Sequence, residues 1–127
     1  MQTQQQIENE REHDFRDMVM ALAKPGSKIL AEMTPGGAHL LHMVLGISGE
    51  AGELLDAVKK HVIYGKDLDL DNVTEEAGDI LFYLEGLLQP LGISLDQCRL
   101  ATMDKLAKRY PGLTYTNQAA IERADKQ

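Results

Sequence analysis

Four acidic side chains in the sequence have the spacing of a metal site. Glu50 and Glu53 are three residues apart in a segment with helical character, and residues three apart in a helix share a face. Glu76 and Asp79 repeat that spacing further along the chain. If the two helices pack antiparallel, the four carboxylates converge, and their mutual repulsion requires a neutralising cation. Hard oxygen ligands without a nearby histidine or cysteine suit Mg²⁺ or Mn²⁺.

The bland alternative is that these acids are solvated surface charge, the usual role of glutamate pairs on helices. Their neighbours argue against it, because glycines and an alanine surround the first pair and the second runs into the apolar stretch ILFYL. Gly49, Gly52 and Gly78 each cost a helix roughly 0.5–1 kcal/mol relative to alanine. We therefore expect them to let a neighbouring helix or a ligand approach the backbone. For Gly46, one turn before the acids, tight helix packing is an equally good explanation.

The elements that must position these residues are predicted to be helices, because apolar residues recur at helical spacing and no strand pattern is present. Pro and Gly clusters such as KPGS, TPGG and Pro111-Gly112 separate them. Asp69 or Asp71 can cap one helix, and Ser94 with Gln97 forms a capping box for the next. The expected helices cover about residues 3–23, 38–63, 71–89 and 95–109, with short helical turns at 27–33 and around 117–124.

We therefore predict an all-α fold, an antiparallel helical bundle of four to five helices completed by dimerisation. At 127 residues the chain is expected to be a single domain. Within it we distinguish a less regular N-terminal helix and loop at 1–37, the motif-bearing helices at 38–111 and a tail at 112–127.

Composition narrows the classes of partner. The sequence has 13 basic and 20 acidic residues, a net charge of −7, which argues against a nucleic acid as partner. A single cysteine, Cys98, excludes an intrachain disulfide and fits a reducing compartment. The polar N-terminus lacks a signal-peptide pattern, and no apolar run approaches the ~20 residues that span a bilayer. These features predict a cytoplasmic protein that does not bind membranes.

Four stretches of the sequence resemble the MazG-like nucleotide pyrophosphohydrolases, the all-α NTP pyrophosphatase superfamily: GISGEAGELLDAVKKHVIYG, EEAGDILFYLEGLL, LGISLDQC and KLAKRYP. The family signature is Glu-x-x-Glu on one helix and Glu-x-x-Asp on the next. Here it is matched by Glu50-Ala51-Gly52-Glu53 and Glu76-Ala77-Gly78-Asp79. The resemblance covers about residues 38–111 and is nearest to the short single-domain versions common in bacteria and their viruses.

This resemblance implies hydrolysis of a nucleoside triphosphate between its α and β phosphates, giving a monophosphate and pyrophosphate. The four signature acids would be the catalytic residues and would bind Mg²⁺, with Mn²⁺ able to substitute, in a homodimer or homotetramer. The short form favours deoxynucleoside triphosphates, with dGTP among the candidates. Many members carry a second glutamate where this chain has Gly49, so the carboxylate that orients the attacking water stays open.

Four further residues are candidates for binding the substrate. Tyr83 lies one turn after the second acidic pair, where the family often has a tyrosine near the phosphates; a core aromatic is the alternative. Lys60 follows the first pair by two turns, and it equally suits the negative end of its helix. Lys105 and Arg109 lie in the stretch matching the family's KLxKRYP and are expected to contact phosphate.

Other interpretations remain open at this stage. For base recognition, which is expected from the first forty residues or a partner subunit, His39 and Phe15 are candidates. The general expectation for His39, His42 and His61 is a surface or packing role. Asp67-x-Asp69-x-Asp71 invites a calcium-loop interpretation, but the glycine and glutamate that such a loop needs further on are missing. Narrower relatives act on dUTP or phosphoribosyl-ATP. A helical interaction module that has lost catalysis is the non-enzymatic alternative.

Overall fold

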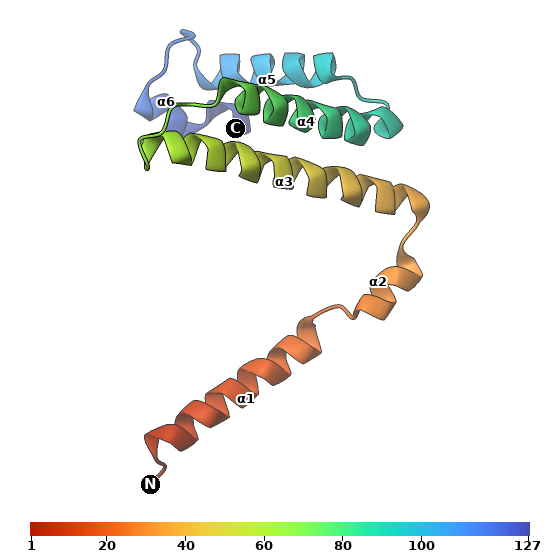
Figure 1. Ribbon diagram of the computed structural model, residues 1–127, viewed down its shortest axis with the longest axis vertical. Coiled ribbons are helices and arrows are strands. Elements are labelled where there is room, and N and C mark those ends of the chain that lie inside the picture. The colour runs from red at the N-terminus through yellow and green to blue at the C-terminus, as the bar shows by residue number, and fades with distance from the viewer. The chain divides into compact units, whose positions relative to one another are not determined.

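The computed structural model describes all 127 residues, and its regular elements are helices throughout (Figure 1). The predicted all-α class is therefore confirmed. The chain divides into two compact units, Met1–Pro35 and Gly36–Gln127. No helix combines the length and the apolar character that a membrane crossing requires.

The N-terminal unit consists of α1 (Gln4–Leu22) and α2 (Gly26–Glu32). A capping box starts α1, in which the Gln6 backbone N–H donates to Thr3 Oγ1 at 3.2 Å and the Thr3 N–H donates to Gln6 Oε1 at 2.9 Å. Neither helix contains a buried residue. Most apolar side chains of α1, Phe15 among them, are exposed to solvent in this structure, and Ile7 is half-buried.

The second unit carries the acidic motifs on two of its helices. Its elements are α3 (Pro35–Val62, starting at the boundary), α4 (Leu70–Leu88), the 3-10 turn η1 (Gln89–Leu91), α5 (Leu95–Arg109), α6 (Asn117–Glu122) and the 3-10 turn η2 (Ala124–Lys126). In Figure 1, α3 and α5 run on either side of α4 and antiparallel to it. The short connections between these helices require this up-and-down arrangement.

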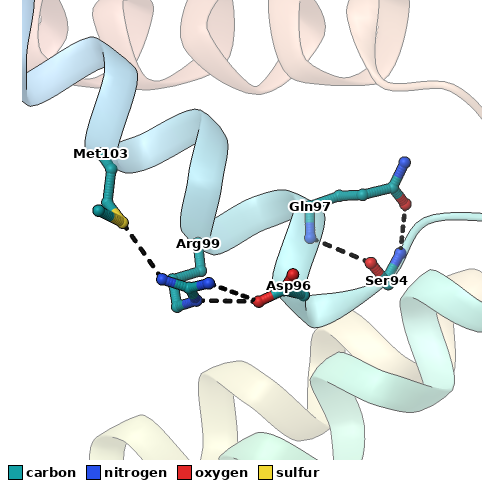
Figure 2. Close-up of polar contacts among 5 residues, drawn as sticks. All are labelled: Ser94, Asp96, Gln97, Arg99 and Met103. Carbon is teal, nitrogen blue, oxygen red and sulfur yellow. Dashed lines mark hydrogen bonds and ion pairs between the residues drawn. The ribbon is translucent and has the colours of Figure 1, made fainter.

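Local signals in the sequence set the helix ends of this unit. The side chain of Asp69 caps α4 by accepting the Asn72 N–H at 3.0 Å, one of the two predicted caps. The predicted capping box at the start of α5 is present, with Ser94 and Gln97 bonded at 2.7 and 3.0 Å (Figure 2). Gly92, in the turn before it, has a φ of +69°, a conformation that glycine adopts without strain.

The contact between α3 and α4 is built around two glycines. The Tyr83 ring on α4 occupies the space that a Cβ on Gly46 of α3 would need. In return, the Met43 side chain on α3 occupies the corresponding space at Gly86 of α4. His39 Nε2, also on α3, donates to the Gly86 carbonyl oxygen at 2.7 Å. Gly46 is thus a packing residue, one of the two explanations that the sequence left open.

The core of the unit is small. Met43, Ala57 and Leu88 are its buried apolar residues, and all three belong to α3 or α4. We call the contact formed by His39, Met43, Gly46, Tyr83 and Gly86 the glycine seam. It fixes the register in which the two acid-bearing helices face each other.

Candidate metal centre

The register of the glycine seam brings the acidic pairs opposite each other. In an antiparallel pair, one turn forward on one helix corresponds to one turn back on the other. One turn beyond Gly46 on α3 is Glu50, and one turn before Tyr83 on α4 is Asp79. The seam therefore positions the second half of α3 against the first half of α4, where their carboxylates meet.

Three of the four predicted acids form a compact group. Carboxylate oxygens of Glu50, Glu76 and Asp79 all lie within 4.8 Å of one another. Glu76 is buried, with 7% of its surface exposed, whereas Glu50 is half-buried and Asp79 is exposed. Glu53 lies outside this group of three and is exposed, but it is close enough to Glu76 to influence its ionisation.

The group is electrostatically strained without a cation. The pKa of Glu76 is raised from 4.5 to about 7, chiefly because its protonated form hydrogen-bonds with Glu50. Burial of the carboxyl group adds to the shift, and so do a hydrogen bond to Glu53 and the negative charges of Glu53 and Glu50. Near neutral pH, the metal-free group therefore binds a proton that an isolated glutamate would have lost.

The chemistry of the group fits a hard divalent cation. Glu76 Oε2 is buried and has no hydrogen-bond partner, an arrangement that is costly for a carboxylate. All ligand atoms on offer in the group are carboxylate oxygens, which Mg²⁺ and Mn²⁺ prefer. A bound cation would give this oxygen a partner and remove the repulsion that raises the Glu76 pKa.

Glycines beside the acids have different surroundings from those of the seam. A Cβ added at Gly49, Gly52 or Gly78 would meet no atom within 4 Å. Packing within this chain therefore does not explain them, and the backbone beside the acids is open to approach from outside.

Among the predicted substrate contacts, Tyr83 lies on α4, one turn beyond Asp79. It is half-buried, and its ring lies in the space beside Gly46 that a Cβ would occupy, which we call the Gly46 notch. The centroid of the Tyr83 ring is 6.2 Å from that of the His42 ring and 5.2 Å from that of the Phe82 ring. Lys60 is exposed and pairs with Asp56 at 2.7 Å, a contact that raises the pKa of the lysine.

The other two predicted contacts lie on α5. Lys105 is exposed. Arg109 donates from Nε and Nη2 to the two oxygens of Asp125 at 2.8 and 3.1 Å. The Asp125 side chain is only 1% exposed, and the hydrogen bonds from Arg109 lower its pKa to about 2. In this structure Arg109 thus anchors the C-terminal segment to α5, and no hydrogen bond or ion pair joins it to the acids.

Sequence reasoning missed Asp125. It is one of several charged residues in the tail, and no spacing rule marks it. Its burial follows from the return of the C-terminal segment to α5, a contact between residues 16 positions apart.

Comparison with known proteins agrees with the geometry. A model of the MazG nucleotide pyrophosphohydrolase domain matches residues 39–114, more than half of the chain. No match was found among curated proteins or among solved structures. The matched region contains α4 and α5, nearly all of α3 and the four signature acids, and enzymes of this family act on nucleotides and are typically metal-dependent. The chain therefore belongs to the MazG nucleotide pyrophosphohydrolase family.

Proposed function

We propose that this protein is a Mg²⁺-dependent nucleoside triphosphate pyrophosphohydrolase that acts on deoxynucleoside triphosphates, with dGTP among the candidate substrates. The observation that carries the proposal is the group formed by Glu50, Glu76 and Asp79, in which a buried carboxylate oxygen lacks a partner. An acidic protein of net charge −7 needs a cation to attract a polyphosphate, and this group offers a place for one.

In the proposed reaction, the oxygen of a water molecule bonds to the α phosphorus and loses a proton to solvent, while the bond from the α phosphorus to the oxygen that bridges to the β phosphate breaks. Pyrophosphate leaves with the electron pair of that bond, and the nucleoside monophosphate remains. Glu50, Glu53, Glu76 and Asp79 would hold the cation. When bound, Mg²⁺ neutralises phosphate charge and increases the acidity of water. The chain's own contribution is to hold these carboxylates on two helices whose register is fixed by the glycine seam.

We also propose that Tyr83, Lys60, Lys105 and Arg109 bind the substrate. Tyr83 is supported by its position one turn from Asp79 and by its fixed ring. The cationic side chains are supported by the family resemblance. Arg109 would have to exchange Asp125 for a phosphate, so its assignment depends on release of the C-terminal segment.

We propose further that the active form is a homodimer or homotetramer. Large apolar side chains on α3 and α4 are exposed, including Leu45 at 61%, Leu55 at 69% and Leu81 at 55%. With so few buried apolar residues, a second copy covering these positions would supply much of the missing core. Light scattering coupled to size-exclusion chromatography tests this, and a monomer at micromolar concentration would contradict it.

The decisive experiment measures turnover and products over a panel of nucleotides. We expect monophosphate and pyrophosphate in the presence of Mg²⁺ or Mn²⁺, no turnover in excess EDTA, and a Glu53→Gln variant that folds but loses activity by orders of magnitude. Release of inorganic phosphate and a nucleoside diphosphate would contradict the proposed bond.

The same panel separates the alternatives. Inclusion of dUTP and phosphoribosyl-ATP tests the narrower specificities. A folded protein that turns over no nucleotide would favour the interaction-module interpretation.

A further inference from the structure

We propose that His42, Phe82 and Tyr83 form the subsite for the nucleobase of the substrate; we call them the aromatic cluster. The inference rests on the proposed function and adds to it the direction in which the nucleotide lies. It starts from the observation that the Tyr83 ring, one turn from Asp79, contacts both the Phe82 ring and the His42 ring of the other helix. The ring planes of His42 and Tyr83 are inclined at 64°, and those of Phe82 and Tyr83 at 85°, both edge-to-face.

The aromatic cluster combines one fixed ring with two accessible ones. The Tyr83 ring sits in the Gly46 notch and is half-buried, so its position is set by the contact between the helices. Phe82 is 68% exposed and His42 is also exposed. A nucleobase can stack on an accessible ring whose neighbours are already held in place, because little side-chain freedom is then lost on binding.

The position of the aromatic cluster along the helices suits a nucleotide whose phosphates lie at the acids. Tyr83 is four residues, about 6 Å, beyond Asp79 on α4. His42 is eight residues, about 12 Å, before Glu50 on α3. The sugar and base of a nucleotide extend over this range from the α phosphate. A base at the cluster therefore requires no displacement of the phosphates from the carboxylates.

The opposite end of α3 has different chemistry. Lys60 lies two turns beyond Glu53 and carries a positive charge, which pairs with Asp56 in this structure and would have to exchange that partner for phosphate. We therefore expect the substrate to lie along α3 in one orientation, with its base at the aromatic cluster and its leaving pyrophosphate toward Lys60. In this orientation the aromatic cluster contacts the base, the part in which nucleotides differ. The acids lie at the phosphates, which all triphosphates have in common.

The test compares a ligand that has a base with one that lacks it. We would measure KM for deoxynucleoside triphosphates, and the inhibition constant of inorganic triphosphate, in the unaltered protein and in the variants His42→Ala and His42→Phe. Loss of stacking in His42→Ala is expected to raise the nucleotide KM about tenfold and to leave inhibition by inorganic triphosphate within about twofold. His42→Phe is expected to restore most of the nucleotide binding. The matched control is His13→Ala, an exposed histidine on α1.

Each outcome bears on the proposal. Equal weakening of nucleotide and inorganic triphosphate in His42→Ala would overturn the base subsite and would show that His42 acts on the phosphates or on the position of Tyr83. An unchanged nucleotide KM in His42→Ala would overturn it as well. If the unaltered protein hydrolysed no nucleotide, the proposed function itself would fail, a result distinguishable from failure of the subsite alone.

Discussion

The two ends of the α3–α4 pair use glycine for different reasons. In the glycine seam, the side chains of Tyr83 and Met43 occupy the space where Gly46 and Gly86 lack a Cβ. Beside the acids, Gly49 and Gly52 face space that no other atom of the chain occupies within 4 Å. The same residue type on the same helix thus serves internal packing at one end and leaves open backbone at the other.

Polar groups show the same contrast. At the seam, the Gly86 carbonyl accepts a hydrogen bond from His39. At the acidic end, Glu76 has an oxygen without a partner and a pKa raised to about 7. The seam, whose polar groups are paired within the chain, fixes the two helices against each other. The acidic end, where a buried oxygen has no partner, is where we expect a ligand to bind and react. The following predictions test this contrast, beginning with the largest effect.

Asp79→Asn is expected to reduce kcat of the proposed pyrophosphohydrolysis by about 100-fold or more, because it removes an anionic oxygen from the acidic group. The matched control is Glu75→Gln, an exposed neighbour outside the group, for which we expect nearly full activity. Steady-state turnover with Mg²⁺ measures both, and circular dichroism confirms that both fold. Similar losses in the two variants would show that general charge, and not the group, matters.

Gly46→Ala is expected to destabilise the protein by about 1–3 kcal/mol, because the new Cβ collides with the Tyr83 ring. Gly52→Ala, on the same helix, is expected to stabilise it by roughly 0.5–1 kcal/mol, since alanine favours the helix and nothing in the chain obstructs it. Denaturant titration of both variants without metal measures the difference. Destabilisation by Gly52→Ala would show that another surface, such as a second copy, reaches the backbone there.

Stability of the metal-free protein is expected to fall as the pH rises from about 4.5 to about 7. The pKa of Glu76 is raised from 4.5 to about 7 on folding, so the folded state binds more protons than the unfolded state across this interval. The stabilising contribution of this proton is complete below the lower value and is lost above the higher one.

Thermal unfolding between pH 5 and 8 measures this slope. Glu76→Gln should flatten it, and Glu75→Gln should retain it. Excess Mg²⁺ at pH 8 should raise the Tm of the unaltered protein and have little effect on Glu76→Gln. A slope that persists in Glu76→Gln would assign it to other groups.

The smallest expected effect is on the Tm and concerns the ion pair between Arg109 and Asp125. Asp125→Asn is expected to lower the Tm at neutral pH, because it removes the buried partner of Arg109. The comparison is Asp96→Asn, whose carboxylate pairs with Arg99 at the exposed surface of α5 and should matter less (Figure 2). Since the pKa of Asp125 is lowered from 3.8 to about 2, its contribution is lost as the pH falls through that interval, and the gap to the unaltered protein should narrow. A Tm difference between Asp125→Asn and the unaltered protein that did not change with pH would show that the Asp125 charge is not what stabilises the protein.

Much of the fold was predictable from the sequence because its signals are local. Ser94 and Gln97 form the expected capping box, and Asp69 caps α4. The spacing of the acidic pairs and the breaks at proline and glycine also depend on only a few neighbouring residues. For the same reason, the family could be recognised from Glu-x-x-Glu and Glu-x-x-Asp before any contact between the helices was known.

The convergence of the acidic pairs was expected from the sequence, but other properties that depend on contacts between distant residues were not predictable. Gly46 and Gly49 look alike in the sequence. Only the register of α3 against α4 shows that a side chain of α4 packs against Gly46 and that nothing in the chain packs against Gly49. The burial of Glu76 and its raised pKa follow from the approach of Glu50 across the helix pair. The pairing of Arg109 with Asp125 likewise arises only when the C-terminal segment returns to α5. Periodicity and capping are encoded within a turn or two of helix, whereas burial and charge coupling depend on which helices meet and in what register.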